Sequence, residues 1–243
     1  MNTTFNYSPN FDIKKRKPKQ IKFLIFHYTG MKRENDAINK LTSFKSKVSS
    51  HYFIKKNGEI LSLVPDLYIA WHAGISSWKN FYLINKYSIG IEISNPGHEN
   101  KYRNFNEKQI NSVIKLSKIL IKKYNIDSKS ILGHSDISPD RKKDPGEKFP
   151  WYYLYKRKIG YWHNLNDKTI LNERNKKINE KDKKIFFKNL SKIGYGRHLI
   201  KKNKKYSKFL TIAFQRRFRQ KLINGVIDKE CLIISQNLTE RLI

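Results

Sequence analysis

Three short apolar runs, each interrupted or followed by a polar side chain, constrain the fold of this chain more than any other feature. The run IKFLIFH ends at His27, and the run YSIGIEIS contains one carboxylate, Glu92. A third run, Ile131-Leu132, leads through a glycine to His134. Short apolar runs rich in Ile, Leu and Phe are typical of strands. We therefore expect a central sheet with candidate functional residues gathered along one edge.

Two stretches between these runs have the spacing of amphipathic helices. Residues 35–47 and residues 106–124 place apolar side chains three and four positions apart. Asn106 is a suitable N-cap for the second helix, and Gln109 stands at the capping-box position. Because strands and helices alternate, the sequence predicts an α/β domain with a mixed central sheet flanked by helices.

A β-hairpin is predicted where two alternating runs flank an Asn-Gly dipeptide. Residues 51–56 and 59–64 have strand periodicity, and Asn57-Gly58 separates them. Both residues of this dipeptide tolerate the positive φ values of a type I′ turn, which joins adjacent antiparallel strands.

The segment GHSDISPDRKKDPGEKFPW brings candidate metal ligands into a turn-rich loop. Asp144 follows His134 by ten residues, so a loop can fold both side chains onto one ion. His27, at the end of a predicted strand, is the best candidate for a third ligand. Two imidazoles and one carboxylate suit zinc, and three protein ligands leave a coordination position open for catalysis.

Other polar and aromatic residues complete a candidate cleft. A carboxylate within an apolar strand is costly unless it is paired or bound to a metal or water, so Glu92 is a candidate for chemistry; a place on a solvated edge strand is the alternative. Trp71 and His72 lie in an aromatic segment that suits a glycan or peptide groove, and a ring cluster that covers a loop is the alternative. His51 and His72 are also rival metal ligands. We expect His51, Trp71, His72 and Asn95 to contact the substrate.

Four blocks of the sequence, taken together, resemble a known family. They are FLIFHYTG, SSHYFIKKNGEI with AWHAGISSW, YSIGIEISNPG and GHSDISPDRKKDPG, in this order. In these blocks the chain resembles zinc-dependent N-acetylmuramoyl-L-alanine amidases of the amidase-2 class, a group that also contains phage-type lysozyme amidases and peptidoglycan recognition proteins. The resemblance implies zinc ligation by His27, His134 and Asp144, with one zinc ion per chain.

The resemblance also implies a reaction. The family hydrolyses the amide between N-acetylmuramic acid and the L-alanine of the stem peptide. The resemblance places stabilisation of the oxyanion on Lys142, whereas Lys143 is expected to point outward. Glu92 is expected to accept a proton from water and to pass it to the leaving amine. A non-catalytic peptidoglycan-binding protein on the same fold is the alternative, and it predicts loss of a zinc ligand, whereas all three are present.

The chain divides by composition into four parts. Residues 1–19 are polar, end in a basic run and are expected to form an arm without regular structure, and residues 20–165 contain the catalytic motifs. Residues 166–184 are highly charged and are expected to form a linker. Residues 185–243 contain three helical patterns, which predict a small three-helix bundle. The motifs KIGYG, TIAFQRRF and NGVIDKE resemble the peptidoglycan-binding domain often fused to these amidases; a helical cap on the catalytic domain is the alternative.

The formal charge of +31 favours anionic partners, but lysine is spread over nearly every segment. A localised phosphate-binding groove is therefore not indicated, and we expect no nucleic acid partner. The basic surface is expected to raise the encounter rate with peptidoglycan or muropeptide fragments, which bear carboxylates.

No apolar run is long enough for a membrane span or for the core of a signal peptide, and a single cysteine excludes an internal disulfide. These features predict a cytoplasmic protein, assumed to be monomeric, that acts on soluble muropeptides including anhydro forms. A wall-binding bundle would instead favour polymeric peptidoglycan and the cell envelope. The sequence leaves this choice open.

Overall fold

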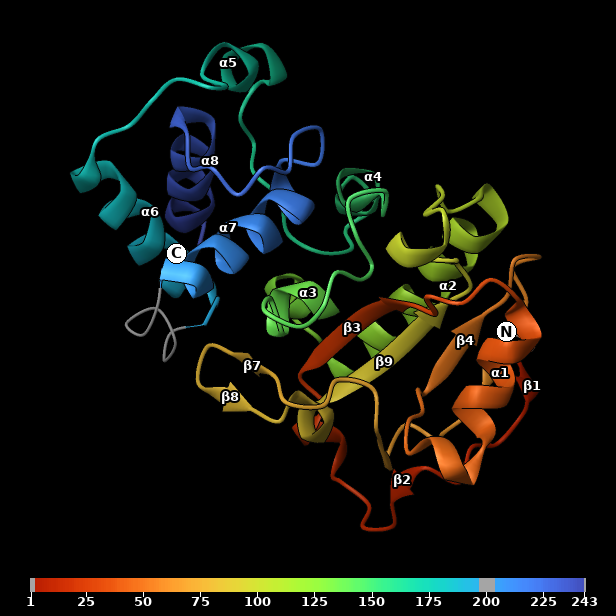
Figure 1. Cartoon of the computed structure of the whole chain (residues 1–243). Coiled ribbons are helices and arrows are strands. Elements are labelled where there is room, and N and C mark those ends of the chain that lie inside the picture. Colours follow the sequence, from red (N-terminus) through yellow and green to blue (C-terminus); the bar gives the residue numbers. More distant parts are fainter. Residues whose placement is uncertain (1–2, 197–203, 243) are drawn as a thin grey trace.

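The computed structural model describes residues 3–196 and 204–242 (Figure 1). Its centre is a six-stranded sheet with the strand order β1-β5-β4-β9-β3-β10. Strands β4 and β5 run antiparallel, and the other neighbouring strands of this sheet run parallel. The predicted mixed sheet is therefore confirmed. The strands are β1 (Thr4–Phe5), β3 (Phe23–Tyr28), β4 (Tyr52–Ile54), β5 (Ile60–Ser62), β9 (Ser88–Ile93) and β10 (Ile131–Gly133).

Two small antiparallel ribbons accompany the sheet. One pairs β2 (Phe11–Asp12) with β6 (Ile69–Ala70), and the other pairs β7 (Ser77–Trp78) with β8 (Phe81–Tyr82). The N-terminal segment is thus not the arm without regular structure that its composition predicted, because β1 and β2 both pair with later strands and Arg16 is buried. Composition was misleading here, since a buried guanidinium is tolerated where backbone carbonyls accept its hydrogen bonds.

Two helices cover opposite faces of the sheet (Figure 1). Helix α1 (Glu34–Thr42) packs on a small apolar cluster that contains Phe53, and helix α2 (Glu107–Tyr124) belongs to the main core together with Ile54. Phe53 and Ile54 are neighbours on β4, and successive side chains of a strand point to opposite faces. The face under α1 is the one that bears the candidate site.

The local predictions are confirmed with one correction. The Asn106 side chain accepts from the Gln109 N–H at 3.0 Å and the Gln109 side chain accepts from the Asn106 N–H at 3.2 Å, which is the predicted capping box. Strands β4 and β5 form the predicted hairpin, but its turn is not type I′, because Gly58 has a φ of 87° whereas Asn57 is not among the residues with positive φ. A 3.0 Å bond from the Gly58 N–H to the Lys55 carbonyl closes the turn instead.

The C-terminal part contains the predicted helices. Helices α6 (Glu180–Ile193), α7 (Lys204–Phe218) and α8 (Lys229–Glu240) form the bundle, and the short helices α3 (His134–Ile137) and α4 (Trp151–Tyr155) lie between it and the sheet (Figure 1).

The segment expected to be a linker contains helix α5 (Asp167–Asn172), which buries Ile170, and also the first turn of α6. Asn166 and Asn179 cap these two helices, so local hydrogen bonds order a highly charged segment. The division into a catalytic and a peptidoglycan-binding domain stays a prediction, and one continuous apolar core joins the sheet to the bundle. Among the described residues, no helix combines the length and apolar character needed to cross a membrane.

Candidate active site

Neighbouring strands bring the first site residues together. His27 on β3 is paired with Glu92 on β9, and Phe53 on β4 is paired with Glu92 from the other side. Paired residues of neighbouring strands point to the same face, so His27 and Glu92 both project on the α1 face of the sheet. His134 begins α3 directly after β10, which is the neighbour of β3.

Three buried atoms form a nearly equilateral triangle. Nδ1 of His27 lies 2.9 Å from Nδ1 of His134 and 3.0 Å from Oδ2 of Asp144. The third side, from His134 Nδ1 to the same Oδ2, measures 3.1 Å. An ion placed about 2.0–2.2 Å from each atom fits above such a triangle. His27, His134 and Asp144 therefore form a group that can hold a metal ion.

A hydrogen-bonded chain behind His27 determines which of its ring nitrogens faces the metal site. Ser88 Oγ donates to the Ile84 carbonyl at 2.8 Å, so this hydroxyl accepts from His72 Nε2, which is 3.0 Å away. Burial, followed by the nearby His27, lowers the pKa of His72 well below its usual value, so the His72 ring is neutral and its Nδ1 can only accept. His27 Nε2 donates to that Nδ1 at 2.9 Å. His27 consequently presents an unprotonated Nδ1 to the metal site.

His134 is oriented in the same way. Its Nε2 donates to the Ala73 carbonyl at 3.1 Å, which leaves Nδ1 directed at the site. Burial, with His134 as the second cause, lowers the pKa of His27 to about 4, so His27 is neutral near pH 7. Burial alone would raise the pKa of Asp144, but the imidazoles of His134 and His27 hold it well below its usual range. Two imidazole nitrogens and one carboxylate oxygen are a suitable donor set for a divalent transition metal.

Glu92 lies beside the ligand triangle without belonging to it. Its Oε2 is buried and has no hydrogen-bond partner among the residues that the structure describes. Burial and then the charge of Asp144 raise the pKa of Glu92 to about 8, and Lys142 opposes this shift. A bound cation would lower the pKa again, because it favours the carboxylate. A half-buried carboxyl group that lines the pocket, with one oxygen lacking a partner among the described residues, is suited to proton exchange with a reacting molecule.

A pocket of about 340 Å³ opens in front of these groups, and its lining includes Trp71, His72, Glu92 and Lys142. The four predicted residues thus share one cavity with the ligands His134 and Asp144. Lys143 lines the same pocket, but its ammonium group pairs with the exposed Glu99 at 2.7 Å. Lys142 has no such ion pair among the described residues.

Two residues expected to contact the substrate lie behind the pocket instead. His51 is fully buried, and its ring accepts from the Gly90 N–H at 3.0 Å and donates to the Tyr68 carbonyl at 3.1 Å. The buried Asn95 side chain donates to the Arg103 carbonyl at 2.9 Å and accepts from the Gly97 N–H at 3.0 Å. The expected substrate contacts do not fit these placements, because the polar atoms of both side chains are used within the fold. The same bonds exclude His51 from the ligand triangle.

A second polar chain at the pocket wall was missed by sequence reasoning. The Tyr28 hydroxyl lies 2.9 Å from His98 Nδ1, and His98 Nε2 lies 3.0 Å from Glu147. Tyr28 lines the pocket. The signal that was available is position: Tyr28 directly follows one ligand, and Glu147 follows Asp144 by three residues.

Comparison with known proteins agrees with this geometry. Residues 17–147 match the N-acetylmuramoyl-L-alanine amidase family known as amidase-2. The chain belongs to the amidase-2 family. The amidase AmiD of Escherichia coli is 33% identical to it over 237 residues, which cover 91% of this chain and 83% of AmiD. The 1,6-anhydro-N-acetylmuramyl-L-alanine amidase AmpD of Haemophilus influenzae is 32% identical over 162 residues, covering 59% of this chain and 85% of AmpD.

Two solved structures of family relatives resemble most of the chain. One is E. coli AmiD in complex with anhydro-N-acetylmuramic acid-L-Ala-D-γ-Glu-L-Lys, with a TM-score of 0.80, 32% identity, and coverage of 91% of this chain and 90% of that one. The other is AmpDh3 of Pseudomonas aeruginosa in complex with anhydromuramic pentapeptide, with a TM-score of 0.81, 29% identity, and coverage of 96% and 97%. At this coverage, the resemblance extends from the sheet into the C-terminal helices.

Proposed function

We propose that this protein is a zinc-dependent N-acetylmuramoyl-L-alanine amidase that hydrolyses the amide between N-acetylmuramic acid and L-alanine in peptidoglycan or its fragments. The observation that supports it most is the ligand triangle of His27, His134 and Asp144 at the wall of an open pocket, beside Glu92, whose Oε2 has no partner among the described residues. Family membership supports the same reaction.

The choice of zinc rests on the donor set. Two imidazole nitrogens and one carboxylate oxygen are the protein ligands of many catalytic zinc sites, in which a fourth position stays open. When bound, Zn²⁺ supplies Lewis acidity, polarising an amide carbonyl and lowering the pKa of water toward ~7. The hydrogen bonds from His27 to His72 and from His134 to Ala73 hold both ligand rings in the required tautomer.

The remaining chemistry belongs to the chain's own side chains. Glu92 accepts a proton from the attacking water and returns it to the leaving amine nitrogen of L-alanine, so this carboxyl group ends the cycle unchanged. Lys142 provides a positive charge where the amide carbonyl oxygen becomes negative, and it also favours the ionised form of Glu92. Trp71 and Tyr28 line the pocket, which supports contacts of these two side chains with the sugar or the peptide.

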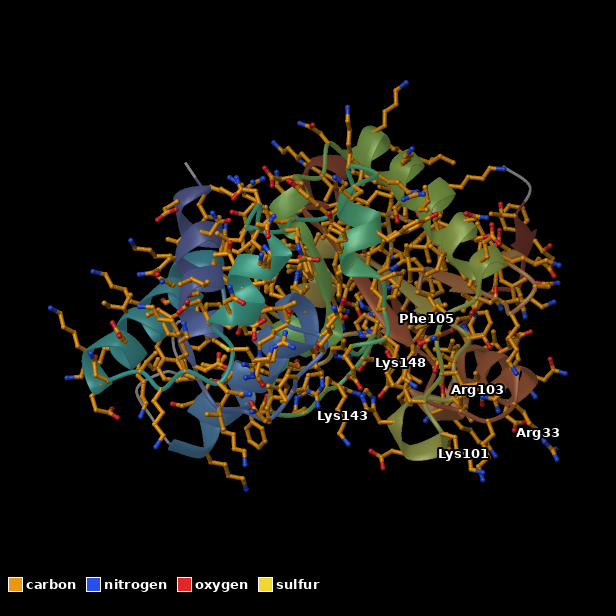
Figure 2. The ribbon with its side chains drawn as sticks, turned by 90° about the horizontal axis from the view of Figure 1, so that it is seen from above. Arg33, Lys101, Arg103, Phe105, Lys143 and Lys148 are labelled. Carbon is orange, nitrogen blue, oxygen red and sulfur yellow. The ribbon has the colours of Figure 1, made fainter. Side chains whose placement is uncertain are left out.

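The printed ligands of the AmiD and AmpDh3 structures are anhydromuramoyl peptides, which supports fragments of this class as substrates. Such fragments bear carboxylates, and exposed basic side chains reach the surface from three segments of the chain, namely Arg33, the pair Lys101 and Arg103, and the pair Lys143 and Lys148 (Figure 2). The resulting field would raise the rate of encounter with an anionic fragment. Peptidoglycan binding by residues 185–243 and a location in the cytoplasm both belong to this proposal.

The test combines metal content with product analysis. Purified protein should contain about one Zn²⁺ per chain, and His134→Ala or Asp144→Ala should lose both the metal and hydrolysis. Mass spectrometry of a digested anhydromuropeptide should show the free sugar acid and the free stem peptide. Cleavage within the peptide or the glycan, or full Zn²⁺ retention by both variants, would overturn the proposal. Parallel digestion of insoluble sacculi and soluble fragments would distinguish the two substrate forms.

A further inference from the structure

We propose that helix α7 of the C-terminal bundle is a positioning element of the metal site, and that Arg217 acts through the buried carboxylate of Asp136 on the ligand His134. This inference rests on the metal site of the proposed function. It assigns the C-terminal helices a role other than peptidoglycan binding. Among the described residues, those that line the active-site pocket include none from α7, so the helix acts through the segment that bears the ligands.

Asp136 connects the bundle to the ligand His134. It lies two residues after this ligand and is 1% exposed. Its Oδ2 accepts from the Gly133 N–H at 2.8 Å and from Arg217 Nη1 at 2.6 Å, and its Oδ1 accepts from the Tyr195 hydroxyl at 2.5 Å. The Asp136 carboxylate therefore fixes the backbone at Gly133, immediately before His134. Arg217 and Tyr195, which lie outside the sheet, fix the carboxylate in turn.

Arg217 also contacts the ligand-bearing segment at a second residue, Ile131. Its Nη2 donates to the Ile131 carbonyl at 2.9 Å, and its guanidinium lies 4.4 Å from the centre of the Trp151 ring. Ile131 precedes His134 and Asp136 follows it, so one side chain contacts the chain on both sides of the ligand. Because a guanidinium is planar and rigid, it fixes the spacing between Ile131, the first residue of β10, and Asp136 in the first turn of α3.

Asp144, the other ligand in this loop, is hydrogen-bonded to the same segment. The Ser135 N–H donates to the Asp144 carbonyl at 2.8 Å. This bond joins the two arms of the loop, the residues around His134 and the residues around Asp144, directly behind the ligand side chains. Gln220, two residues after α7, donates to the carbonyls of Glu147 and Phe149, each at 2.7 Å. The two arms pack so closely that a Cβ at Gly133 would lie 2.6 Å from Cδ of Pro145.

The energetics favour positioning over simple stabilisation. Burying two charges costs several kcal/mol per ion, which an ion pair rarely exceeds in return, so apolar residues of equal size commonly stabilise a core as well. The pair of Arg217 and Asp136 is buried on both sides, at 3% and 1% exposure of the side chains. Its hydrogen bonds reach the backbone just before His134, at the Ile131 carbonyl and the Gly133 N–H, and the carboxylate itself belongs to the residue two positions after His134, which explains its value as a geometric constraint on that ligand.

The test is the Zn²⁺ affinity of the full chain, measured by competition with a chromophoric chelator. Arg217→Met keeps the apolar stem and removes the guanidinium. We expect Zn²⁺ to bind about 10-fold more weakly or worse, since loss of groups that orient metal ligands commonly costs about 10–100-fold in affinity. Arg219→Met is the matched control, because Arg219 is fully buried and pairs with Asp228 and Glu230 inside the C-terminal part of the chain. That variant should lose thermal stability and keep the Zn²⁺ affinity of the wild type.

A milder change covers the case in which Arg217→Met does not fold. Tyr195→Phe removes one hydroxyl and leaves no charge without a partner, and it should weaken Zn²⁺ binding about 2- to 10-fold, equivalent to one hydrogen bond. Unchanged affinity in Tyr195→Phe and in any folded Arg217→Met would overturn the proposal, as would an equal loss in Arg219→Met. A wild-type chain that binds no Zn²⁺ would instead overturn the proposed function.

Discussion

His27 and Glu92 occupy paired positions on the parallel strands β3 and β9, so their side chains leave the sheet on the same face. One presents Nδ1 to the ligand triangle, and the other ends in a buried oxygen without a partner among the described residues. The sheet thus places a metal ligand and a proton acceptor side by side on rigid backbone, which is the support that a catalytic pair requires.

Glu92→Gln should separate metal binding from chemistry. The amide keeps the size of the carboxylate but does not accept a proton near pH 7, so Zn²⁺ and substrate should still bind. The turnover number should fall by about 10²- to 10⁴-fold, the usual contribution of a general base. Metal analysis and steady-state kinetics on an anhydromuropeptide check both points. If the variant loses its metal, Glu92 is a ligand; if it keeps full activity, another group moves the proton.

The same substitution should stabilise the metal-free protein at alkaline pH. Burial raises the pKa of Glu92 to about 8, whereas an unfolded glutamate titrates near ~4.3. Between about pH 4 and pH 8 the folded state therefore keeps a proton that the unfolded state has lost. The free energy of unfolding of the wild type falls as the pH rises through this range. Glu92→Gln should melt higher than the wild type above about pH 8, by roughly 2–4 °C for each kcal/mol, and equally below about pH 4. A lower melting temperature at high pH would contradict this expectation.

Disturbing the acceptor behind His27 should weaken metal binding without removing a ligand. His72→Phe keeps an aromatic ring at this position, although a larger one, and deletes the Nδ1 that accepts from His27 Nε2. Gly90→Ala should act similarly, because a Cβ at Gly90 would lie 2.5 Å from Cγ of His72 and displace its ring. Chelator competition should show Zn²⁺ affinity reduced by about 10–100-fold in both variants. Unchanged affinity in His72→Phe would show that the tautomer of His27 is held by other means.

Lys142→Ala should reduce turnover while leaving Zn²⁺ bound, since its ammonium group is expected to stabilise the developing oxyanion. Loss of one such group commonly costs about 10²- to 10³-fold in rate. Lys143→Ala is the natural comparison, because the neighbouring lysine is paired with Glu99 at the surface and should change the rate by less than about 3-fold. Equal losses in the two variants would indicate a shared role of positive charge rather than a specific site.

Local periodicity accounts for most of the elements that were predicted correctly. The spacing of apolar residues and the Asn106 and Gln109 pair were sufficient to place α2, because both features act within one or two helical turns. The N-terminal segment was predicted incorrectly for the complementary reason. Its order depends on pairing of β1 with β5 and on hydrogen bonds from Arg16 to carbonyls 50 and 69 positions away, which no local pattern records.

The sequence by itself determined the chemistry that is available. It identified the family, the types of metal ligand, and Glu92 as a carboxylate that the apolar pattern of its strand does not explain. The resemblance favoured His27 over His51, and the tertiary structure supplied the physical reason: both imidazoles are buried, but the His51 ring nitrogens are used by Gly90 and Tyr68, whereas His27 Nδ1 lies 3.0 Å from Asp144. The tertiary structure also revealed the pairing of Asp136 with Arg217, which are 81 positions apart. Periodicity encodes whether a side chain is buried, whereas its partner depends on how distant elements pack.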